Sequence, residues 1–326
     1  MAIPILLFVV GLVLLVKGGD WFVDGAGGIA YRFHLPEVLI GATVVSIGTT
    51  LPEVMVSATS AISGHGEIAY GNAIGSIICN TALIAALSVA IHPGRVERRA
   101  VALPVIFFFG AAVIYSAVAY VSGEFSRLVG IVLLLLFLAY MVISVKNALG
   151  SLPKEAPVTA EPAANDPAPS PLWKDLLFLV LGAALIAFGA DLLVDNGTLI
   201  AAWLGVPEAV IALTFVALGT SLPELVTAIT ALAKGHGALS LGNVIGANLF
   251  NLVLVSGVAT VLSPFRVPGG KTLGGISTSL LIDIPVMLSV MLLLCLPALL
   301  RGKLSRWQGI LLLAIYAAFC AVQFVL

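Results

Sequence analysis

The hexapeptide GTTLPE occupies residues 48–53, and GTSLPE occupies residues 219–224. Both copies place a glycine, hydroxyl side chains, a proline and a glutamate inside long apolar runs. A proline within a helix has no N–H and displaces the carbonyl four residues earlier. Pro52 and Pro223 therefore each free the carbonyl of the glycine that opens the motif. We interpret the hexapeptides as paired breaks in two helices that cross an apolar medium.

The composition indicates that this medium is a lipid bilayer. Of 326 residues, 60% are hydrophobic and only 10% are charged, and the mean hydropathy is +1.17. Soluble domains carry roughly 25% charged residues. The apolar stretches are continuous over roughly 20 residues, the length of a spanning helix, whereas outer-membrane barrels alternate apolar and polar positions. A net charge of −1 provides no basic surface for nucleic acid.

The chain contains an internal duplication. The step from Glu53 to Glu224 is 171 positions, and the same step aligns the chain with itself from about residue 18 to residue 80. The aligned motifs are GATVVSIGTTLPE (41–53) with ALTFVALGTSLPE (212–224), identical at 7 of 13 positions, and GNAIGSIICN (71–80) with GNVIGANLFN (242–251), identical at 5 of 10. Apolar bias does not produce matches at Pro, Glu and Asn, so these matches indicate a repeat.

Each half contains five apolar segments. We place them at 2–32, 36–63, 68–91, 100–121 and 126–146, then at 173–203, 207–233, 239–262, 274–299 and 305–326. After an odd number of spans, the second half must enter the membrane from the opposite side. The sequence thus predicts an all-α integral membrane protein of ten transmembrane helices, built as two inverted five-helix repeats with broken core helices.

The repeats are joined by a segment of different composition. We assign residues 1–146 to the first repeat and residues 173–326 to the second. Residues 147–172 are rich in Pro and Ala and hold six of the chain's 17 prolines. Such a composition cannot form a packed core, which predicts a solvated linker.

Basic residues predict the orientation. With the N-terminus outside, eleven of them lie in cytoplasmic loops: Arg32, Arg95, Arg98, Arg99, Lys146, Lys154, Lys174, Lys234, Arg301, Lys303 and Arg306. The outer loops hold three: Arg127, Arg266 and Lys271. The positive-inside rule therefore places both termini outside and the linker in the cytoplasm.

The motifs bring carboxylates to the middle of two spans. A charged carboxylate at the bilayer centre costs roughly 2.5–3.5 kcal/mol on insertion scales. Glu53 and Glu224 occupy equivalent points of an inverted pair and are expected to converge at mid-membrane. Two facing carboxylates repel each other unless a cation or protons neutralise them.

Neighbouring segments supply further oxygen atoms. Asn72, Ser76 and Asn80 are spaced i, i+4, i+8 on one helix face. The equivalent stripe in the second half is Asn243, Ala247 and Asn251. Asn72 and Asn243 can act as ion ligands or as interhelical hydrogen-bonding groups, and both interpretations stay open.

This donor set favours hard cations. Carboxylate, hydroxyl, amide and carbonyl oxygens suit Ca²⁺, Na⁺ and H⁺ rather than zinc or copper. The three cysteines are scattered through apolar runs and the histidines lie outside the spans or at their ends. The charge of −2 on two carboxylates matches one Ca²⁺, two Na⁺ or two protons. We therefore expect a cation exchanger that uses no cofactor.

The paired GTxLPE and GNxIGxxxxN motifs resemble those of the sodium/calcium exchangers of the calcium/cation antiporter superfamily, in particular its compact prokaryotic members. The resemblance covers essentially the whole chain. It implies Ca²⁺/Na⁺ antiport by alternating access in a prokaryotic plasma (inner) membrane. It also implies a core of the second, third, seventh and eighth helices, past which the long first and sixth helices slide.

The resemblance also implies roles for individual residues. Glu53 and Glu224 would bridge Ca²⁺, while Thr49 and Thr220 would add carbonyl or hydroxyl oxygens. The remaining implied ligands are the backbone carbonyls of Ser46 and Ala217 and the side chains of Ser76, Asn80 and Asn251. The family usually has serine where this chain has Ala247, so one hydroxyl ligand of a sodium site is missing.

Other functions fit less well. A proton-coupled exchanger of Ca²⁺ or another divalent cation is the main alternative, and a cation channel is a further one because acidic rings also select cations. An enzyme is not expected, because the chain lacks the HExxH and P-loop motifs. Asp20, Asp24, Asp191 and Asp195 lie near the ends of long helices, where interface solvation and gating are both open interpretations. The sequence carries no signal for an oligomeric state.

Overall fold

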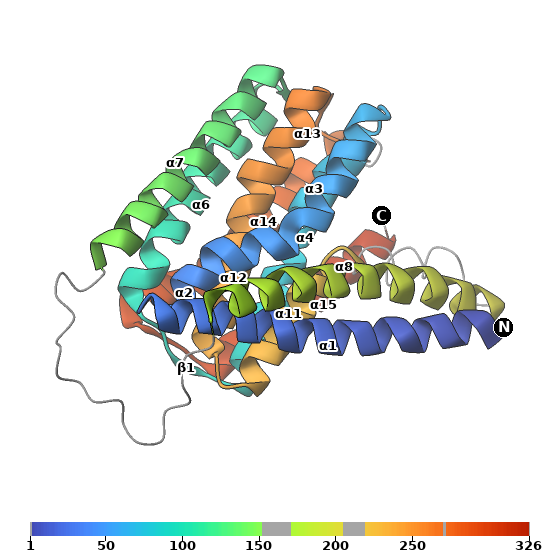
Figure 1. Ribbon diagram of the computed structural model, residues 1–326. Helices are drawn as coiled ribbons and strands as arrows, with labels where there is room; N and C mark the ends of the chain where they lie inside the picture. Colours follow the sequence, from blue (N-terminus) through green and yellow to red (C-terminus); the bar gives the residue numbers. More distant parts are fainter. Residues whose placement is uncertain (1, 152–170, 205–218, 270–271, 326) are drawn as a thin grey trace.

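The computed structural model describes residues 2–151, 171–204, 219–269 and 272–325, and these form an all-helical bundle (Figure 1). The α-helices of the first half are α1 (Ala2–Arg32), α2 (Glu37–Ile40), α3 (Ser46–Ile62), α4 (Gly66–Cys79), α5 (Ala86–Ile91), α6 (Arg98–Val121) and α7 (Arg127–Ser151). Those of the second half are α8 (Leu172–Trp203), α11 (Leu222–Ala233), α12 (Gly237–Phe250), α13 (Ser256–Leu262), α14 (Ile284–Arg301) and α15 (Arg306–Val325).

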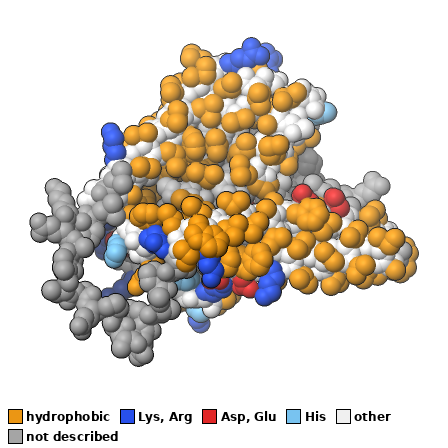
Figure 2. Space-filling model, in the orientation of Figure 1, with side chains coloured by type: hydrophobic (Ala, Val, Ile, Leu, Met, Phe, Trp, Pro, Cys, Tyr) orange, Lys and Arg blue, Asp and Glu red, His pale blue; other side chains and the backbone are white. Residues whose placement is uncertain are grey.

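Among the described residues, nine helical stretches are long and apolar enough to cross a membrane. A shorter apolar helix, α11, adds to them. Hydrophobic side chains cover most of the visible outer face of the helices (Figure 2). The prediction of an all-helical integral membrane protein is confirmed. The predicted linker is described only at its edges, because α7 continues to Ser151 and residues 152–170 lie outside the described part.

Short π-helical segments interrupt the core helices. They are η1 (Gly41–Val45), η2 (Asn80–Ala85), η4 (Asn251–Val255) and η5 (Ser279–Asp283). The first three join neighbouring α-helices into continuous spans, such as α4–η2–α5 over residues 66–91. A π turn widens the helix and occurs frequently at functional sites.

The two hexapeptides have different local structures. Pro52 lies inside α3, which continues through it, and the departure from α geometry is the preceding π segment, η1. In the second copy, α11 begins at Leu222, so Pro223 lies in the first turn, where its missing N–H is tolerated. The expected position of the break is therefore wrong for α3. The preceding residues 205–218 lie outside the described part.

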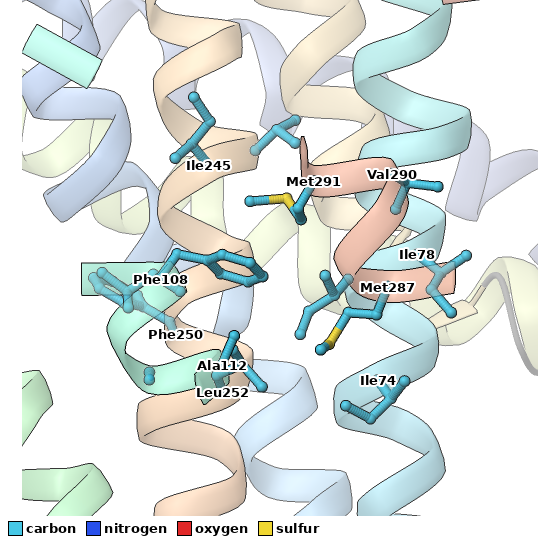
Figure 3. Close-up of a cluster of buried hydrophobic side chains, with 14 of the residues drawn as sticks. Ile74, Ile78, Phe108, Ala112, Ile245, Phe250, Leu252, Met287, Val290 and Met291 are labelled. Carbon is cyan, nitrogen blue, oxygen red and sulfur yellow. The ribbon is translucent and has the colours of Figure 1, made fainter. Parts of the chain in front are cut away.

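The largest core lies between α4, α6, α12 and α14. Figure 3 shows Ile78 of α4, Phe108 of α6, Phe250 of α12 and Met287 of α14 directed into one apolar cluster. These four side chains are fully or almost fully buried. The cluster fixes the relative positions of α4 and α12, the two helices that carry the GN motifs.

A second apolar cluster contains residues of α1 and α8, which lie side by side in Figure 1, together with residues of α2, α11 and α12. Glycines allow their backbones to touch. A Cβ atom on Gly11 would lie 2.8 Å from the carbonyl oxygen of Gly189, and one on Gly18 would lie 2.9 Å from that of Gly182. Such small-residue contacts replace hydrophobic burial as the means of helix association in a bilayer.

Two-residue strands tie loops together. β1 (Gly94–Arg95) pairs antiparallel with β6 (Lys303–Leu304), and β2 (Glu124–Phe125) pairs with β3 (Phe265–Arg266). Both of these pairings join the first half of the chain to the second. β4 (Thr272–Leu273) and β5 (Ile276–Ser277) form a local hairpin.

Candidate ion-binding site

Glu53 and Glu224 are completely buried. Their carboxylates are close enough to repel each other when both are ionised. Among the described residues, none of the four carboxylate oxygens has a hydrogen-bond partner. An ionised carboxylate is costly to bury unless it is paired, so this arrangement favours a positively charged ligand between them.

The helices place the two acids differently. Glu53 lies in the middle of α3, one residue after Pro52. Glu224 lies in the first turn of α11, where the positive end of the helix dipole favours a carboxylate. α3 and α11 contact each other, so the equivalent residues of the duplication meet inside the bundle.

Asn80 and Asn251 occupy equivalent and unusual positions. Asn80 is the first residue of η2, and Asn251 is the first residue of η4. Both side chains are fully buried, and within the described chain neither the amide oxygen nor the amide nitrogen of either has a partner. The two GN motifs therefore end at the same local distortion, each with a carboxamide available to a ligand.

Hydroxyl groups of α3 are held by α12. The Ser46 Oγ donates to the carbonyl oxygen of Gly41 at 2.7 Å and contacts that of Asn243 at 3.0 Å. The Thr49 Oγ1 donates to the Asn243 Oδ1 at 3.2 Å. On the other stripe, the Asn72 Nδ2 donates to the carbonyl oxygen of Glu53 at 3.2 Å. Both asparagines thus make interhelical hydrogen bonds, one of the two roles expected for them.

The other candidate residues are distributed around these groups. Ser76 and Thr220 line a cavity of about 360 Å³, together with Asn72 and Cys79. Ala247 is fully buried in α12. Ala217 lies outside the described residues. The structure therefore brings the two carboxylates, two carboxamides and several hydroxyls into the same group of helices.

Several polar residues in this region were not predicted. Ser221 and Thr227 are buried and have hydroxyl oxygens without a partner in the described part of the chain. Asn248 donates from its Nδ2 to the Thr81 Oγ1 at 2.7 Å, while its Oδ1 is unpartnered there. The signal for Asn248 was an amide in an apolar run, but the other repeat has isoleucine at the equivalent position, so the duplication did not mark it.

The donor atoms indicate the kind of ion. Among the described residues, no group of three or more His, Cys, Asp or Glu side chains comes together to hold a metal ion. What converges instead is two carboxylates with neutral oxygen donors, the ligands that Ca²⁺ and Na⁺ prefer. A bundle of membrane-length helices that buries this set in its interior defines a transporter of inorganic cations.

Comparison with known proteins identifies the family. The model of the sodium/calcium exchanger protein family matches residues 3–146 and 174–325. The chain belongs to this family and is a cation antiporter. The predicted family resemblance is therefore confirmed.

Named relatives span the whole chain. It is 34% identical over 332 residues to a putative antiporter, CaxA, from Alkalimonas amylolytica, covering 100% of this chain and 99% of that protein. It is 31% identical over 355 residues to the sodium/calcium exchanger MaX1 from Methanosarcina acetivorans, covering 98% of each.

Solved structures share the fold. A structure of the sodium–calcium exchanger NCX_Mj soaked with 10 mM Na⁺ and 10 mM Sr²⁺ superposes with a TM-score of 0.80 at 35% identity, covering 98% of this chain and 99% of that one. A second structure of the same exchanger, soaked with zero Na⁺ and Ca²⁺, gives a TM-score of 0.81 at 34% identity, covering 99% and 100%.

Proposed function

We propose that this protein exchanges Ca²⁺ for Na⁺ across a prokaryotic plasma membrane by alternating access. The main support is the pair of fully buried carboxylates, Glu53 and Glu224, whose oxygens lack partners among the described residues. One Ca²⁺ or two Na⁺ would neutralise their charge of −2. Relatives named sodium/calcium exchangers add support for this choice of ions.

Each donor would have a distinct role. Glu53 and Glu224 bridge Ca²⁺, because only they supply full negative charge. Asn80 and Asn251 supply amide oxygens from the start of their π segments. Thr49 and Thr220 contribute hydroxyl or carbonyl oxygens, Ser76 contributes its side chain, and Ser46 and Ala217 contribute backbone carbonyls.

The direct test uses purified protein in liposomes with imposed gradients. An outward Na⁺ gradient at equal pH is expected to drive Ca²⁺ uptake, and dissipating it is expected to stop uptake. Uptake driven only by a pH gradient would assign proton coupling instead. Uptake driven by the Ca²⁺ gradient alone, with no counter-ion, would identify a channel.

A specific residue favours proton coupling as the second candidate. In the first stripe, Ser76 offers a hydroxyl, whereas the equivalent residue of the second stripe is Ala247. Na⁺ binding depends on the number of surrounding oxygens more than Ca²⁺ binding does, because Ca²⁺ retains the attraction of both carboxylates. Loss of one oxygen therefore weakens Na⁺ coupling first.

Ala247→Ser tests this point. We expect the apparent affinity for Na⁺, measured by competition against Ca²⁺ at fixed pH, to rise several-fold while the Ca²⁺ affinity changes little, since the serine adds one oxygen ligand and Ca²⁺ already has both carboxylates. Ser76→Ala is the matched variant and should weaken Na⁺ competition. An unchanged Na⁺ affinity in Ala247→Ser would mean that the missing hydroxyl does not set the choice of ion.

The proposal includes the topology. The two halves are inverted five-helix repeats, residues 1–146 and 173–326, joined by a cytoplasmic linker over 147–172, with both termini outside. The excess of basic residues in the loops assigned to the cytoplasm supports this orientation.

Single cysteines at positions 2 and 326 test the orientation, in a variant without Cys79, Cys295 and Cys320. An impermeant maleimide added to intact cells is expected to label both sites, because both termini face outward. A cysteine at position 160, in the linker, is the control and should react only after the cells are opened. Protection of one terminus alone would contradict five spans per repeat, and protection of both would contradict the orientation.

A further inference from the structure

Lys234 links the end of α11 to the second half of α1. It follows the last residue of α11, and its Nζ lies 2.7 Å from the Oδ1 of Asp24 and 3.5 Å from the Oδ1 of Asp20 on α1. The same nitrogen donates to the main-chain oxygen of Asp20 at 3.0 Å. The two aspartates are one helical turn apart, so one ammonium group holds α1 at two points.

Two further ion pairs lie near this junction in the sequence. The Nδ1 of His236, just before α12, lies 2.7 Å from the Oε1 of Glu37 on α2. The Nε of Arg32, the last residue of α1, lies 3.8 Å from the Oδ2 of Asp175 on α8. In the proposed topology, all these contacts lie toward the cytoplasm.

The duplication provides an internal comparison. The step of 171 positions takes Asp20 and Asp24 to Asp191 and Asp195 on α8, but it takes Lys234 to Ser63, at the end of α3. Asp191 and Asp195 are exposed and form no ion pair within the described ranges. The aspartates are therefore duplicated, whereas the lysine is present on one side only.

The packing shows the same asymmetry. α1 lies directly against α11, so that a Cβ atom on Gly19 would be 2.7 Å from the Thr230 Oγ1 and 2.8 Å from the Val226 Cγ1. At the equivalent place between α8 and α3 there is instead a mainly apolar cavity of about 740 Å³, lined by residues that include Met55 and Asp191. Among the described residues, α1 thus packs closely against α11 beside the lysine, whereas α8 and α3 leave a space between them.

The α1–α8 pair lies outside the largest core. Its two helices touch through glycine backbones and belong to a second apolar cluster, which also contains residues of α2, α11 and α12. Its contacts to the rest of the bundle therefore decide where the pair rests.

We propose that Lys234 is a positioning residue whose ion pairs with Asp20 and Asp24 hold the α1–α8 pair against α11, so that the cytoplasmic side is closed at rest. The contact between α1 and α11 depends on charge. During each transport cycle it is replaced by the equivalent contact of α8 with α3, which has no lysine. The assignment of this contact to the cytoplasmic side and to a transport cycle rests on the proposed function. The difference between the α1–α11 and α8–α3 contacts does not.

The test measures conformation separately from transport. Spin-label pairs at the exposed positions Tyr31 and Leu300 report the cytoplasmic side, and pairs at Leu204 and Val121 report the outer side. Distances are measured in the purified protein, in a variant without the native cysteines. The variants are Lys234→Ser, the conservative Lys234→Arg, Ser63→Lys, and the exchange Lys234→Ser with Ser63→Lys.

Lys234→Ser is expected to raise the ratio of open to closed cytoplasmic distances roughly three- to tenfold, because a partly exposed ion pair with two carboxylates is worth a modest free energy. Lys234→Arg should retain the wild-type distribution. The double variant, Lys234→Ser with Ser63→Lys, should close the outer side and open the cytoplasmic side. Its new lysine can form ion pairs with Asp191 and Asp195, as Lys234 does with Asp20 and Asp24.

Unchanged distances in Lys234→Ser, or equal broadening on both sides, would overturn the proposal, because a merely structural lysine would loosen the fold without shifting the balance. In liposomes, Lys234→Ser should change the apparent Ca²⁺ affinity of the two faces in opposite directions. If the wild type shows no ion-coupled flux, the proposed function fails, while the distance measurements still decide whether Lys234 selects the conformation.

Discussion

Glu53→Gln and Glu224→Gln will each lower Ca²⁺ transport by roughly tenfold to hundredfold or more, while the protein still inserts and elutes as the wild type does. Glutamine keeps the shape of the side chain and removes its charge. Ca²⁺ thereby loses one of its two negatively charged ligands, and each 1.4 kcal/mol of lost attraction corresponds to a factor of about ten. Both residues are completely buried, so bulk water does not compensate Ca²⁺ for the lost charge.

The measurement is Ca²⁺ uptake into proteoliposomes, with Ca²⁺ binding by calorimetry beside it. Glu67→Gln is the matched control, because Glu67 lies in an exposed position in the first turn of α4. It should transport normally. We also expect the two buried variants to be at least as stable as the wild type without Ca²⁺, because each removes repulsion between the carboxylates. Near-normal Ca²⁺ flux in either variant would remove that residue from the site.

Gly246→Ala will have the second large effect, although it adds a single methyl group. A Cβ atom on Gly246 would overlap the Ser46 Oγ and lie 2.6 Å from the Cα of Ala42 in η1. Ala42 lies in η1 and Ser46 is the first residue of α3, so this segment cannot retreat without moving Ser46 and Thr49. Overpacking of this kind costs roughly 1–3 kcal/mol, and we expect a lower thermal midpoint together with weaker Ca²⁺ binding.

The duplication supplies the control for this variant. Gly75 is the equivalent glycine of the first GN motif, and a Cβ atom there meets no atom within 4 Å. Gly75→Ala should therefore leave both the thermal midpoint and Ca²⁺ binding close to wild type. Equal effects of the two substitutions would mean that helix propensity, rather than the contact with Ser46, governs the response.

The general fold and the two buried glutamates could be predicted because they depend on the polarity of the side chains, which is visible in the sequence. A carboxylate inside an apolar run is costly, so the sequence alone is enough for Glu53 and Glu224 to indicate a site. The 171-position repeat then indicates that the two acids meet. Asn80 and Asn251 follow from the same repeat, because each closes a copy of the GN motif.

Other features could not be predicted because nearly identical residues adopt different structures. Pro52 lies inside α3, which continues on both sides of it, whereas Pro223 lies in the first turn of α11. The choice is made by the tertiary contacts of each helix, not by the hexapeptide. The π segments also depend on such contacts: the side chain of Ser46 bonds to the carbonyl of Gly41, and the Tyr140 hydroxyl donates to that of Ala42.

The glycine contacts between α1 and α8 follow the rule for an interface between identical subunits. Gly11 touches Gly189, and Gly18 touches Gly182, while the 171-position step converts Gly11 into Gly182 and Gly18 into Gly189. The surface is thus self-complementary, which is the property of a twofold symmetric dimer. A chain carrying one half alone would present this stripe to a second copy of itself. The duplicated chain thus contains, inside one polypeptide, the kind of contact that two identical subunits make.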